Sequence, residues 1–365
     1  MPPLSRRALN RATLARQMLL DREAAEPIEA LERLAGLQAQ LPRPPFLALW
    51  SRVRGFQRKA LSDLLLQRRA VRATLMRGTL HIVTARDFRS LRASLQPGLD
   101  RGLAAALRGR TGAIDMERLL SIACEYFSES PRTFDELRHF LATLYPQDDI
   151  RAMAYVIRLK LPLVQVPDES DWSYPSPANF AEAQSFLGKP LSSASDPRAL
   201  ILRYLSAFGP ATPADAQTWL GLPSLQAAFE ALRAKLQTFE DEKHRELFDL
   251  PDAPRPPGDA VAPVRFLPEF DSVVLAHADR TRLVRPEYRA RLYRPNLVVP
   301  PTFLVDGFVE GTWALERKRK STRLVLTPFA KLRKNDRSAL SEEAESMLRF
   351  SEGDQVEINI RFAAG

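Results

Sequence analysis

Two glutamines stand on either side of a single alanine in the stretch GLQAQLPRPP, residues 36–45, as Gln38 and Gln40. An amide is not a base near neutral pH, but its carbonyl accepts hydrogen bonds and its NH2 group donates two. Such a pair of amides suffices to hold a water molecule. Two glutamines at i and i+2 also arise often by chance, and the alternative roles are helix capping or surface solvation.

The surrounding residues predict that the glutamines lie where a helix ends. The segment IEALERLAGLQ has apolar residues at helical spacing, and Pro42, Pro44 and Pro45 are expected to stop this helix and stiffen the segment that follows. Trp50, at helical spacing from Phe46, is expected in the core.

Other familiar catalytic groups are missing from the sequence. The four histidines stand at no recognisable metal spacing, and HExxH, CxxC, P-loop and dinucleotide motifs are absent, so we expect no metal, no nucleotide cofactor and no other cofactor. The single cysteine, Cys124, lies among apolar residues at helical spacing and is expected in the core. Nucleotide hydrolysis and hydride transfer are therefore disfavoured.

The charge distribution indicates a polyanionic partner. The chain carries a formal net charge of +9, and it is uneven. Residues 1–110 hold 21 lysines and arginines against 8 acidic residues, and residues 315–337 hold nine against two. Arginines interrupt every apolar patch of the N-terminal stretch and no run reaches membrane-spanning length, so we expect a cytoplasmic, nucleoid-associated protein without a membrane partner.

The pattern of elements predicts an α+β fold, mainly α, built from repeated units. In residues 198–250 a helix, a turn capped by Thr212, two further helices and two strands give the order of a winged helix. The same order can be traced twice upstream, and short strands follow a proline-rich connection at 250–264. We expect three tandem winged-helix units, at 1–110, 111–190 and 191–262, and a small β-rich, barrel-like module at 263–365, in a monomer.

Basic residues at two predicted hairpins are candidate DNA contacts. The stretch LERKRKSTRL predicts a hairpin with Arg317, Lys318, Arg319 and Lys320 at its tip and Arg323 on the following strand, which suits insertion along a nucleic-acid groove. The alternative is a solubilising loop on an exposed edge. The third unit, whose predicted wing EDEKHRE has more acid than base, is a poor candidate for phosphate contact.

A second predicted hairpin lies in the first unit. The segments VRATLM and TLHIVT face each other across Arg77 and Gly78. Arg77 at this turn could contact phosphate. His81 could support the active site, or it could point inward and pack under the hairpin.

Four segments together resemble a known family. In chain order, LAGLQAQLPRPP, RGTLHIVTARD, LPEFDSVVLAHADR and LVDGFVEGTW resemble the AlkZ-like DNA glycosylases of the winged-helix DNA-binding-domain family. The resemblance implies three winged-helix units followed by a barrel-like module, an active site containing Gln38 and Gln40, and a β-hairpin that engages DNA. Asp271 and Asp279 match the third segment, and we assign them a structural role.

This resemblance implies cleavage of the bond between a deoxyribose and a damaged base. A purine alkylated at N7 is already cationic and leaves without acid assistance, so Gln38 and Gln40 would have to orient only the attacking water. A related form of the motif has an aspartate in the place of Gln40. The glutamine predicts a narrower range: cationic N7-alkylated purines in double-stranded DNA, including bulky natural-product adducts and crosslinks, removed in repair or self-resistance.

Two alternatives follow for the function. No lysine stands out as a Schiff-base nucleophile, so the expected enzyme is a monofunctional DNA glycosylase that leaves the backbone intact. The competing interpretation is a non-catalytic winged-helix DNA-binding protein, either a transcription regulator or a lesion-sequestering factor. A regulator would prefer one DNA sequence strongly, whereas a glycosylase would not.

Overall fold

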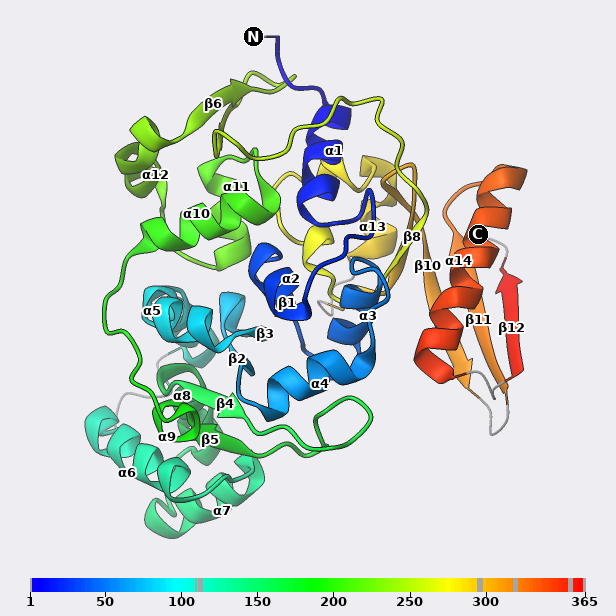
Figure 1. The fold of residues 1–365 in the computed structure, drawn as a ribbon. Coiled ribbons are helices and arrows are strands. Elements are labelled where there is room, and N and C mark those ends of the chain that lie inside the picture. The colour runs from blue at the N-terminus through cyan, green and yellow to red at the C-terminus, as the bar shows by residue number, and fades with distance from the viewer. Residues whose placement is uncertain are drawn as a thin grey trace.

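The computed structural model describes residues 2–108, 110, 114–293, 298–317, 321–353 and 357–363. Helices surround a sheet near the middle of the molecule, and a second sheet carries the C-terminal residues along one side (Figure 1). Helices and strands are mixed, as the sequence predicts. Each of these two sheets has five strands within the described residues.

The N-terminal helices form where apolar residues recur at helical spacing. Ser5 caps the first of them by accepting a hydrogen bond from the backbone of Ala8. The long helix α5, which the sequence analysis did not predict, is capped by the hydroxyl of Thr84. The bounds are α1 Arg6–Arg16, α2 Pro27–Arg33, α3 Pro44–Trp50, α4 Arg58–Leu66 and α5 Ala85–Leu107.

The central sheet joins residues from the first two predicted units. Its order is β1-β3-β2-β4-β5, and every neighbouring pair is antiparallel. The predicted hairpin at Arg77 is present, because β2 and β3 pair directly with the 3-10 turn η1 (Met76–Gly78) between them. The bounds are β1 Leu37–Gln38, β2 Ala70–Thr74, β3 Leu80–Thr84, β4 Leu163–Gln165 and β5 Phe180–Glu182.

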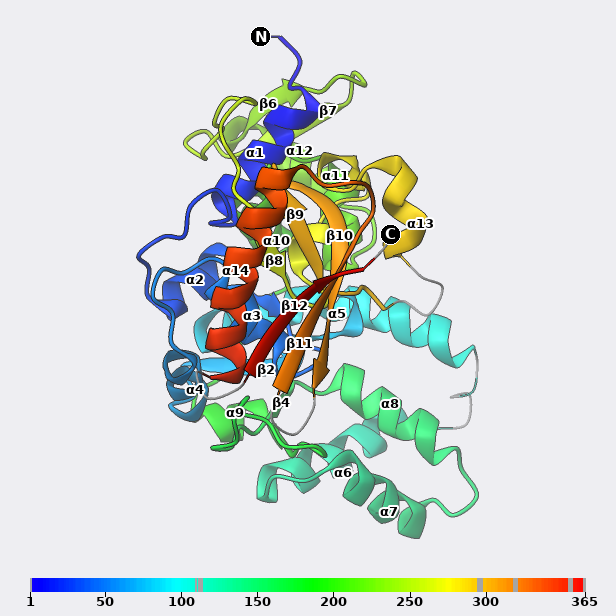
Figure 2. The ribbon, with the colours of Figure 1, turned by 90° about the vertical axis from the view of Figure 1, so that its right-hand side faces the viewer.

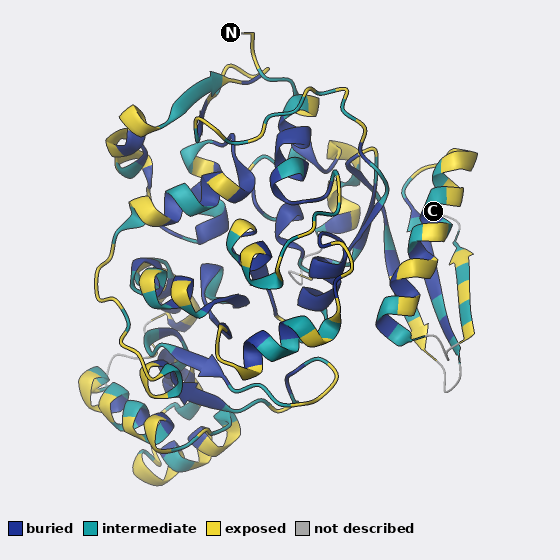
Figure 3. Cartoon of the chain, viewed as in Figure 1, coloured by how far each residue is buried: buried dark blue, intermediate teal, exposed yellow. Residues whose placement is uncertain are grey.

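The second predicted unit places three capped helices before β4. Figure 3 shows buried stripes on α6 and α7 facing the protein and exposed stripes facing away. Residues 171–175 form a loop, and the strand that pairs with β4 is β5, which begins at Phe180. The helices are α6 Met116–Glu129, α7 Phe134–Leu144, α8 Ile150–Lys160 and the short α9 Ala183–Leu187.

The third unit has the predicted order of three helices and a hairpin. Thr212 and Asp215 form a capping box at the second helix. The proline-rich connection after the hairpin is a loop, as predicted. The bounds are α10 Pro197–Phe208, α11 Pro213–Leu220, α12 Gln226–Leu232, β6 Gln237–Glu240 and β7 Glu246–Asp249.

The C-terminal sheet is open, so the predicted barrel-like closure is wrong. Its order is β12-β11-β10-β9-β8; β11 and β12 run parallel, and no ladder of described residues joins β12 to β8. Helix α14 covers one face (Figure 2) and also packs against α3. The bounds are α13 Arg289–Leu292, α14 Lys334–Glu352, β8 Arg265–Leu267, β9 Thr302–Val305, β10 Phe308–Arg317, β11 Ser321–Pro328 and β12 Glu357–Phe362.

The N-terminal helices and the C-terminal sheet share one core. Phe46 and Trp50 from α3 pack in the same buried cluster as Phe266 and Leu348, which confirms Trp50 as a core residue. Beneath them, Arg52 and Asp271 form a fully buried ion pair at 2.8 Å. Arg52 follows α3 and Asp271 follows β8, so this ion pair joins the N-terminal helices next to Gln38 to the C-terminal sheet that carries the basic hairpin.

Candidate functional site

Gln38 lies in a short strand, not at the end of a helix. Helix α2 ends at Arg33, and the chain reverses through Ala35 and Gly36, which have φ values of 56° and 87°. A Cβ on Gly36 would stand 2.5 Å from the side chain of Val83, so only glycine fits. The predicted role of the prolines is also wrong, because Pro44 and Pro45 begin α3 instead of stopping a helix.

The amide of Gln38 is held by an arginine. Gln38 is only 7% exposed, and its side-chain oxygen accepts a 2.8 Å hydrogen bond from a terminal nitrogen of Arg77. A guanidinium can donate but cannot accept, so this contact fixes which end of the amide faces the arginine. The NH2 end of Gln38 is therefore directed away from Arg77 and is available as a donor.

Gln40 is exposed, in contrast with Gln38. Its side-chain oxygen stands 3.4 Å from the backbone N–H of Leu80, a long contact that leaves accepting capacity. Its backbone is fixed by Arg72, which donates to the carbonyls of Ala39 at 2.8 Å and of Gln40 at 3.2 Å. The motif thus combines one buried amide and one solvent-facing amide on a rigid backbone. Arg72 was not recognised in the sequence; it is buried, like every other residue of β2.

Arg77 lies in the turn η1 and is partly buried, and two of its guanidinium nitrogens bond groups of the protein. Its backbone adopts φ +57°, and its guanidinium donates to the carbonyl of Trp219 as well as to Gln38. Burial, aided by the nearby charge of Arg280, lowers the pKa of Arg77 to about 10. Two of its N–H groups are therefore engaged within the protein, and a phosphate contact by Arg77 stays a prediction.

His81 lies directly opposite Gln38 across the β1–β3 ladder. It is fully buried, and its Nδ1 is 3.1 Å from the carbonyl of Thr79. A donor at Nδ1 leaves Nε2 as an acceptor, and this atom has no partner in the described part of the chain. Burial, with the charge of Arg77, lowers the pKa of His81 to about 3. His81 is therefore a neutral side chain packed under the hairpin and beside the motif.

The two strands of the predicted basic hairpin are present, and a glutamate connects their ends to the LPRPP segment, residues 41–45, that follows the glutamine motif. Strands β10 and β11 pair up to Arg317 and Thr322; Lys318, Arg319 and Lys320 lie outside the described residues. Arg317 donates to Glu352 at 2.9 Å, and Glu352 also accepts from Arg43 at 2.6 Å. Arg323 is 3.5 Å from Glu316. Glu352 thus joins the hairpin to the LPRPP segment.

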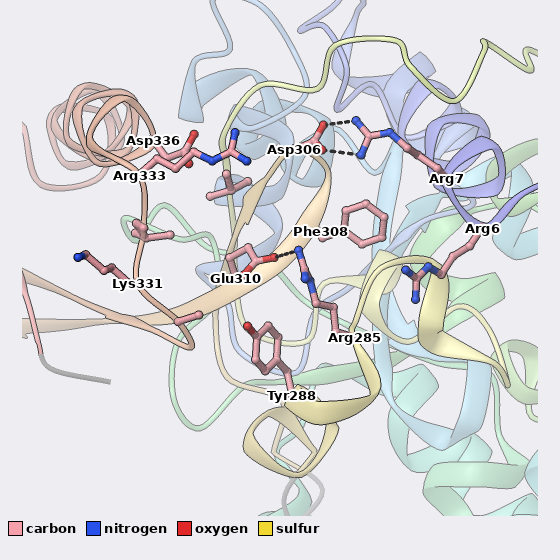
Figure 4. Close-up of a pocket in the computed structure, with 13 residues that line it drawn as sticks. Arg6, Arg7, Arg285, Tyr288, Asp306, Phe308, Glu310, Lys331, Arg333 and Asp336 are labelled. Atoms are coloured by element: carbon pink, nitrogen blue, oxygen red, sulfur yellow. Dashed lines mark hydrogen bonds and ion pairs between the residues drawn. The ribbon is translucent and has the colours of Figure 1, made fainter.

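The two basic regions of the sequence meet at the other end of β10. A cavity of about 520 Å³ is lined by Arg6 and Arg7 from the N-terminal region and by Lys331 and Arg333 from the C-terminal region (Figure 4). Arg7 is paired with Asp306, whereas no described partner neutralises Arg6, Lys331 or Arg333. These cations are candidate phosphate contacts that the sequence analysis did not single out.

The structure also shows the surroundings of Asp271, Asp279 and Cys124, to which the sequence assigned structural roles. Asp271 pairs with Arg52, and Asp279 bonds Lys243 and Thr281, so both hold the fold together. Cys124 is only partly buried, which corrects its assignment to the core. Among the described residues there is no group of three or more His, Cys, Asp or Glu side chains that could hold a metal ion. No described helix is long and apolar enough to cross a bilayer.

Comparison with known proteins identifies the family of the chain and a solved structure with the same fold. Residues 31–350 match the family described as DNA glycosylase AlkZ-like. The chain is 29% identical over 170 residues to an interstrand DNA cross-link repair glycosylase of Streptomyces sahachiroi, and this match spans 44% of each protein. The solved structure of Streptomyces sahachiroi DNA glycosylase AlkZ superposes with a TM-score of 0.81 at 21% identity, covering 99% of this chain and 100% of that one. With the family match extending over most of its length, the chain belongs to the AlkZ-like DNA glycosylases.

Proposed function

We propose that the protein is a monofunctional DNA glycosylase that hydrolyses the N-glycosidic bond of cationic N7-alkylated purines in double-stranded DNA. Bulky natural-product adducts and crosslinks belong to this class, in repair or in self-resistance. The observation that carries the proposal is the amide of Gln38, oriented by Arg77 next to the exposed Gln40. Three tandem winged-helix units on one chain would engage the duplex as a monomer.

The amides would hold the attacking water between them. The NH2 group of Gln38 donates to the water oxygen, and the side-chain oxygen of Gln40 accepts one of its protons. A remaining lone pair of the water then faces C1′. Arg77 strengthens this arrangement because a donor at the amide oxygen polarises the amide and makes its N–H groups better donors.

The electron balance requires no general acid. When the C1′–N9 bond breaks, its electron pair stays on N9 and neutralises the cationic purine, which leaves as a neutral base. The sugar becomes an oxocarbenium ion, the water adds to C1′, and the surplus proton passes to solvent. His81 does not serve as the base at neutral pH because its pKa is about 3; we assign it support of the strand that carries Gln38.

A monofunctional reaction agrees with the groups around the motif. In the described residues, the side-chain partners of the two glutamines are Arg77 and a backbone N–H, and none is a lysine. Without an amine at C1′, no Schiff base forms and the abasic strand stays intact.

Base release tests the proposal directly. Purified protein is incubated with a duplex that contains N7-methylguanine, and released base and strand breaks are measured separately. We expect release without strand cleavage, and a loss of at least about a hundredfold in Gln38→Ala and Gln40→Ala with duplex binding retained. Gln67→Ala, an exposed glutamine on the C-terminal side of α4, is the matched control.

Two results would contradict the assignment. If each single glutamine variant stays within a few-fold of the wild type, the catalytic role of the motif is wrong. If the wild type releases no base from N7-methylguanine or from bulky N7-guanine adducts, and instead binds one DNA sequence tightly, the protein is a non-catalytic DNA-binding protein.

A further inference from the structure

A second cavity, of about 450 Å³, opens directly after Gln40. Residues 41–44 form one wall and the loop 170–174 forms another, while Glu269 and Arg317 complete the lining. The cavity therefore lies between the glutamine motif and the base of the basic hairpin. Tyr174 in its wall stacks on Arg72, the same side chain that fixes the backbone of Gln40.

The charges in this cavity differ from those of the rest of the molecule. Both arginines that line it, Arg43 and Arg317, are already bonded to Glu352. Two acidic side chains, Asp171 and Glu269, line it without an ion pair from the described residues. Because Arg43 and Arg317 share the one carboxylate of Glu352, the charged groups at this cavity sum to a single negative charge when Glu269 is ionised. Asp171 and Glu269, which have no ion pair among the described residues, are the groups that could meet a cationic ligand.

Glu269 is the acid placed to recognise such a ligand. It follows β8, and the next residue, Phe270, has a left-handed φ of +59°, a backbone conformation that turns the chain sharply there. The side chain is partly buried, and among the described residues the only donor to its carboxylate is its own backbone N–H. Burial raises the pKa of Glu269. A cation bound beside the Glu269 carboxylate would offset the free energy that the ionised carboxylate loses when it is removed from water.

The other walls are partly aromatic and partly apolar. Trp172 is partly exposed; it has an edge contact with Phe46 at 5.2 Å between ring centres, and the guanidinium groups of Arg43 and Arg58 lie over its ring. Tyr174 is buried, with Arg72 over its ring. Leu41 is 47% exposed, which makes it a rare large apolar side chain left open to solvent beside the motif. Enzymes that act on a base commonly turn it out of the duplex between aromatic and apolar side chains and read its pairing edge by hydrogen bonds.

We propose that this cavity receives the cationic N7-alkylguanine base, with the Glu269 carboxylate accepting hydrogen bonds from the N1–H and N2–H groups of its pairing edge. The inference rests on the proposed function and makes it specific: the base is turned out of the duplex, and the enzyme selects it for its charge. An unmodified guanine presents the same N1–H and N2–H groups but carries no positive charge, so it binds to the cavity more weakly.

Two measurements test the cavity. In the first, single-turnover base release from an N7-methylguanine duplex is compared in wild type, Glu269→Gln and Glu269→Asp. We expect release to fall about tenfold or more in Glu269→Gln, partial recovery in Glu269→Asp, and unchanged or tighter binding of undamaged duplex because a negative charge is lost. Glu117→Gln, an exposed glutamate on α6, is the control for a charge change elsewhere. Equal melting temperatures confirm that each variant folds.

The second measurement needs no catalysis. Quenching of tryptophan fluorescence is titrated with 7-methylguanosine, at mildly acidic pH where the purine is a full cation, and with guanosine. Trp172 is the partly exposed tryptophan in the cavity, whereas Trp50, Trp219 and Trp313 are buried. We expect several-fold tighter binding of the cation in wild type, a preference lost in Glu269→Gln.

The outcomes separate the two proposals. Wild-type base release with Glu269→Gln within twofold of it would overturn the cavity and leave the proposed function standing. No release by wild type from N7-methylguanine or from bulky N7-guanine adducts would refute the proposed function, and the nucleoside titration would still decide whether the cavity prefers the cation. Equal binding of 7-methylguanosine and guanosine overturns the inference in either case.

Discussion

The guanidinium of Arg77 donates a 2.8 Å hydrogen bond to the side-chain oxygen of Gln38. Since the same guanidinium also bonds the carbonyl of Trp219, one side chain links the turn of the β2–β3 hairpin, the glutamine motif and the end of α11.

Replacing Arg77 with lysine should slow base release more than it weakens DNA binding. A lysine keeps the charge but cannot hold both oxygens in a fixed plane, so we expect about tenfold slower release, and near wild-type affinity for undamaged duplex. Arg101→Lys is the matched control, because Arg101 is exposed and bonds the neighbouring carbonyl of Gly221 without touching Gln38. Weakened DNA binding at an unchanged rate would instead identify Arg77 as a phosphate contact.

The stability of the protein should fall as the pH drops from neutral. Burial lowers the pKa of both His81 and His277 to about 3, from an ordinary value of 6.5. The unfolded chain then binds more protons than the folded one between these values, so the stabilisation is present above about pH 6.5 and is lost as the pH falls toward 3. Each histidine should account for about 2 kcal/mol between pH 7 and pH 5.

Urea unfolding at the two pH values measures this loss. His81→Gln removes one of the two titrating groups and should roughly halve the pH dependence. His139→Gln, which changes an exposed histidine, is the control. Equal pH dependence in all three proteins would show that His81 is not buried as a neutral side chain.

Glu352 should be needed for turnover although it does not touch the motif. Its carboxylate holds Arg43 and Arg317 together, so Glu352→Gln is expected to release the base of the hairpin and slow base release about tenfold. Binding to undamaged duplex should stay equal or become tighter, because the net charge rises by one. The comparison variant is Glu345→Gln, on the same helix, where the ion pair to Arg349 is half exposed. Similar rates for both variants would count against a positioning role.

Lys331 and Arg333 should contribute to affinity in a salt-dependent way. Each phosphate contact adds about 0.9 to the slope of log affinity against log salt, so the double variant Lys331→Ala/Arg333→Ala should lower this slope by up to about 2. Lys235→Ala, in the third unit beside its acidic hairpin, serves as the control. The experiment is fluorescence anisotropy of a duplex at several salt concentrations. An unchanged slope would remove the cavity of Figure 4 from the DNA-binding surface.

Local patterns in the sequence predict the helices and hairpins well because their determinants are close in the chain. The capping box of Thr212, the alternation on both sides of Arg77 and the strands around Arg317 each lie within a few residues of one another. The helix α5 was missed although Thr84 and Asp87 mark its start.

The surroundings of Gln38 could not be predicted in the same way. The strand β1 has two residues and exists through its pairing with β3, more than forty positions later. Its start depends on Gly36 lying against Val83. A proline pair can end one helix or begin another, and only the strand pairing at Gln38 decides in favour of the second. Likewise, the guanidinium of Arg77 bonds the carbonyl of Trp219, which lies far along the chain.

The contact between Arg77 and Trp219 has a consequence for exchanges of segments between relatives. The helices of the third unit share one buried cluster with β2, β3 and α5, so exchanging residues 191–262 for those of a relative would change that packing. The exchange would also move the carbonyl of Trp219, and Gly221 lies so close to the Arg77 backbone that a Cβ there would approach it to 3.0 Å. We therefore expect that an exchange of this segment changes the orientation of Gln38 through Arg77, although no residue of the motif itself is altered.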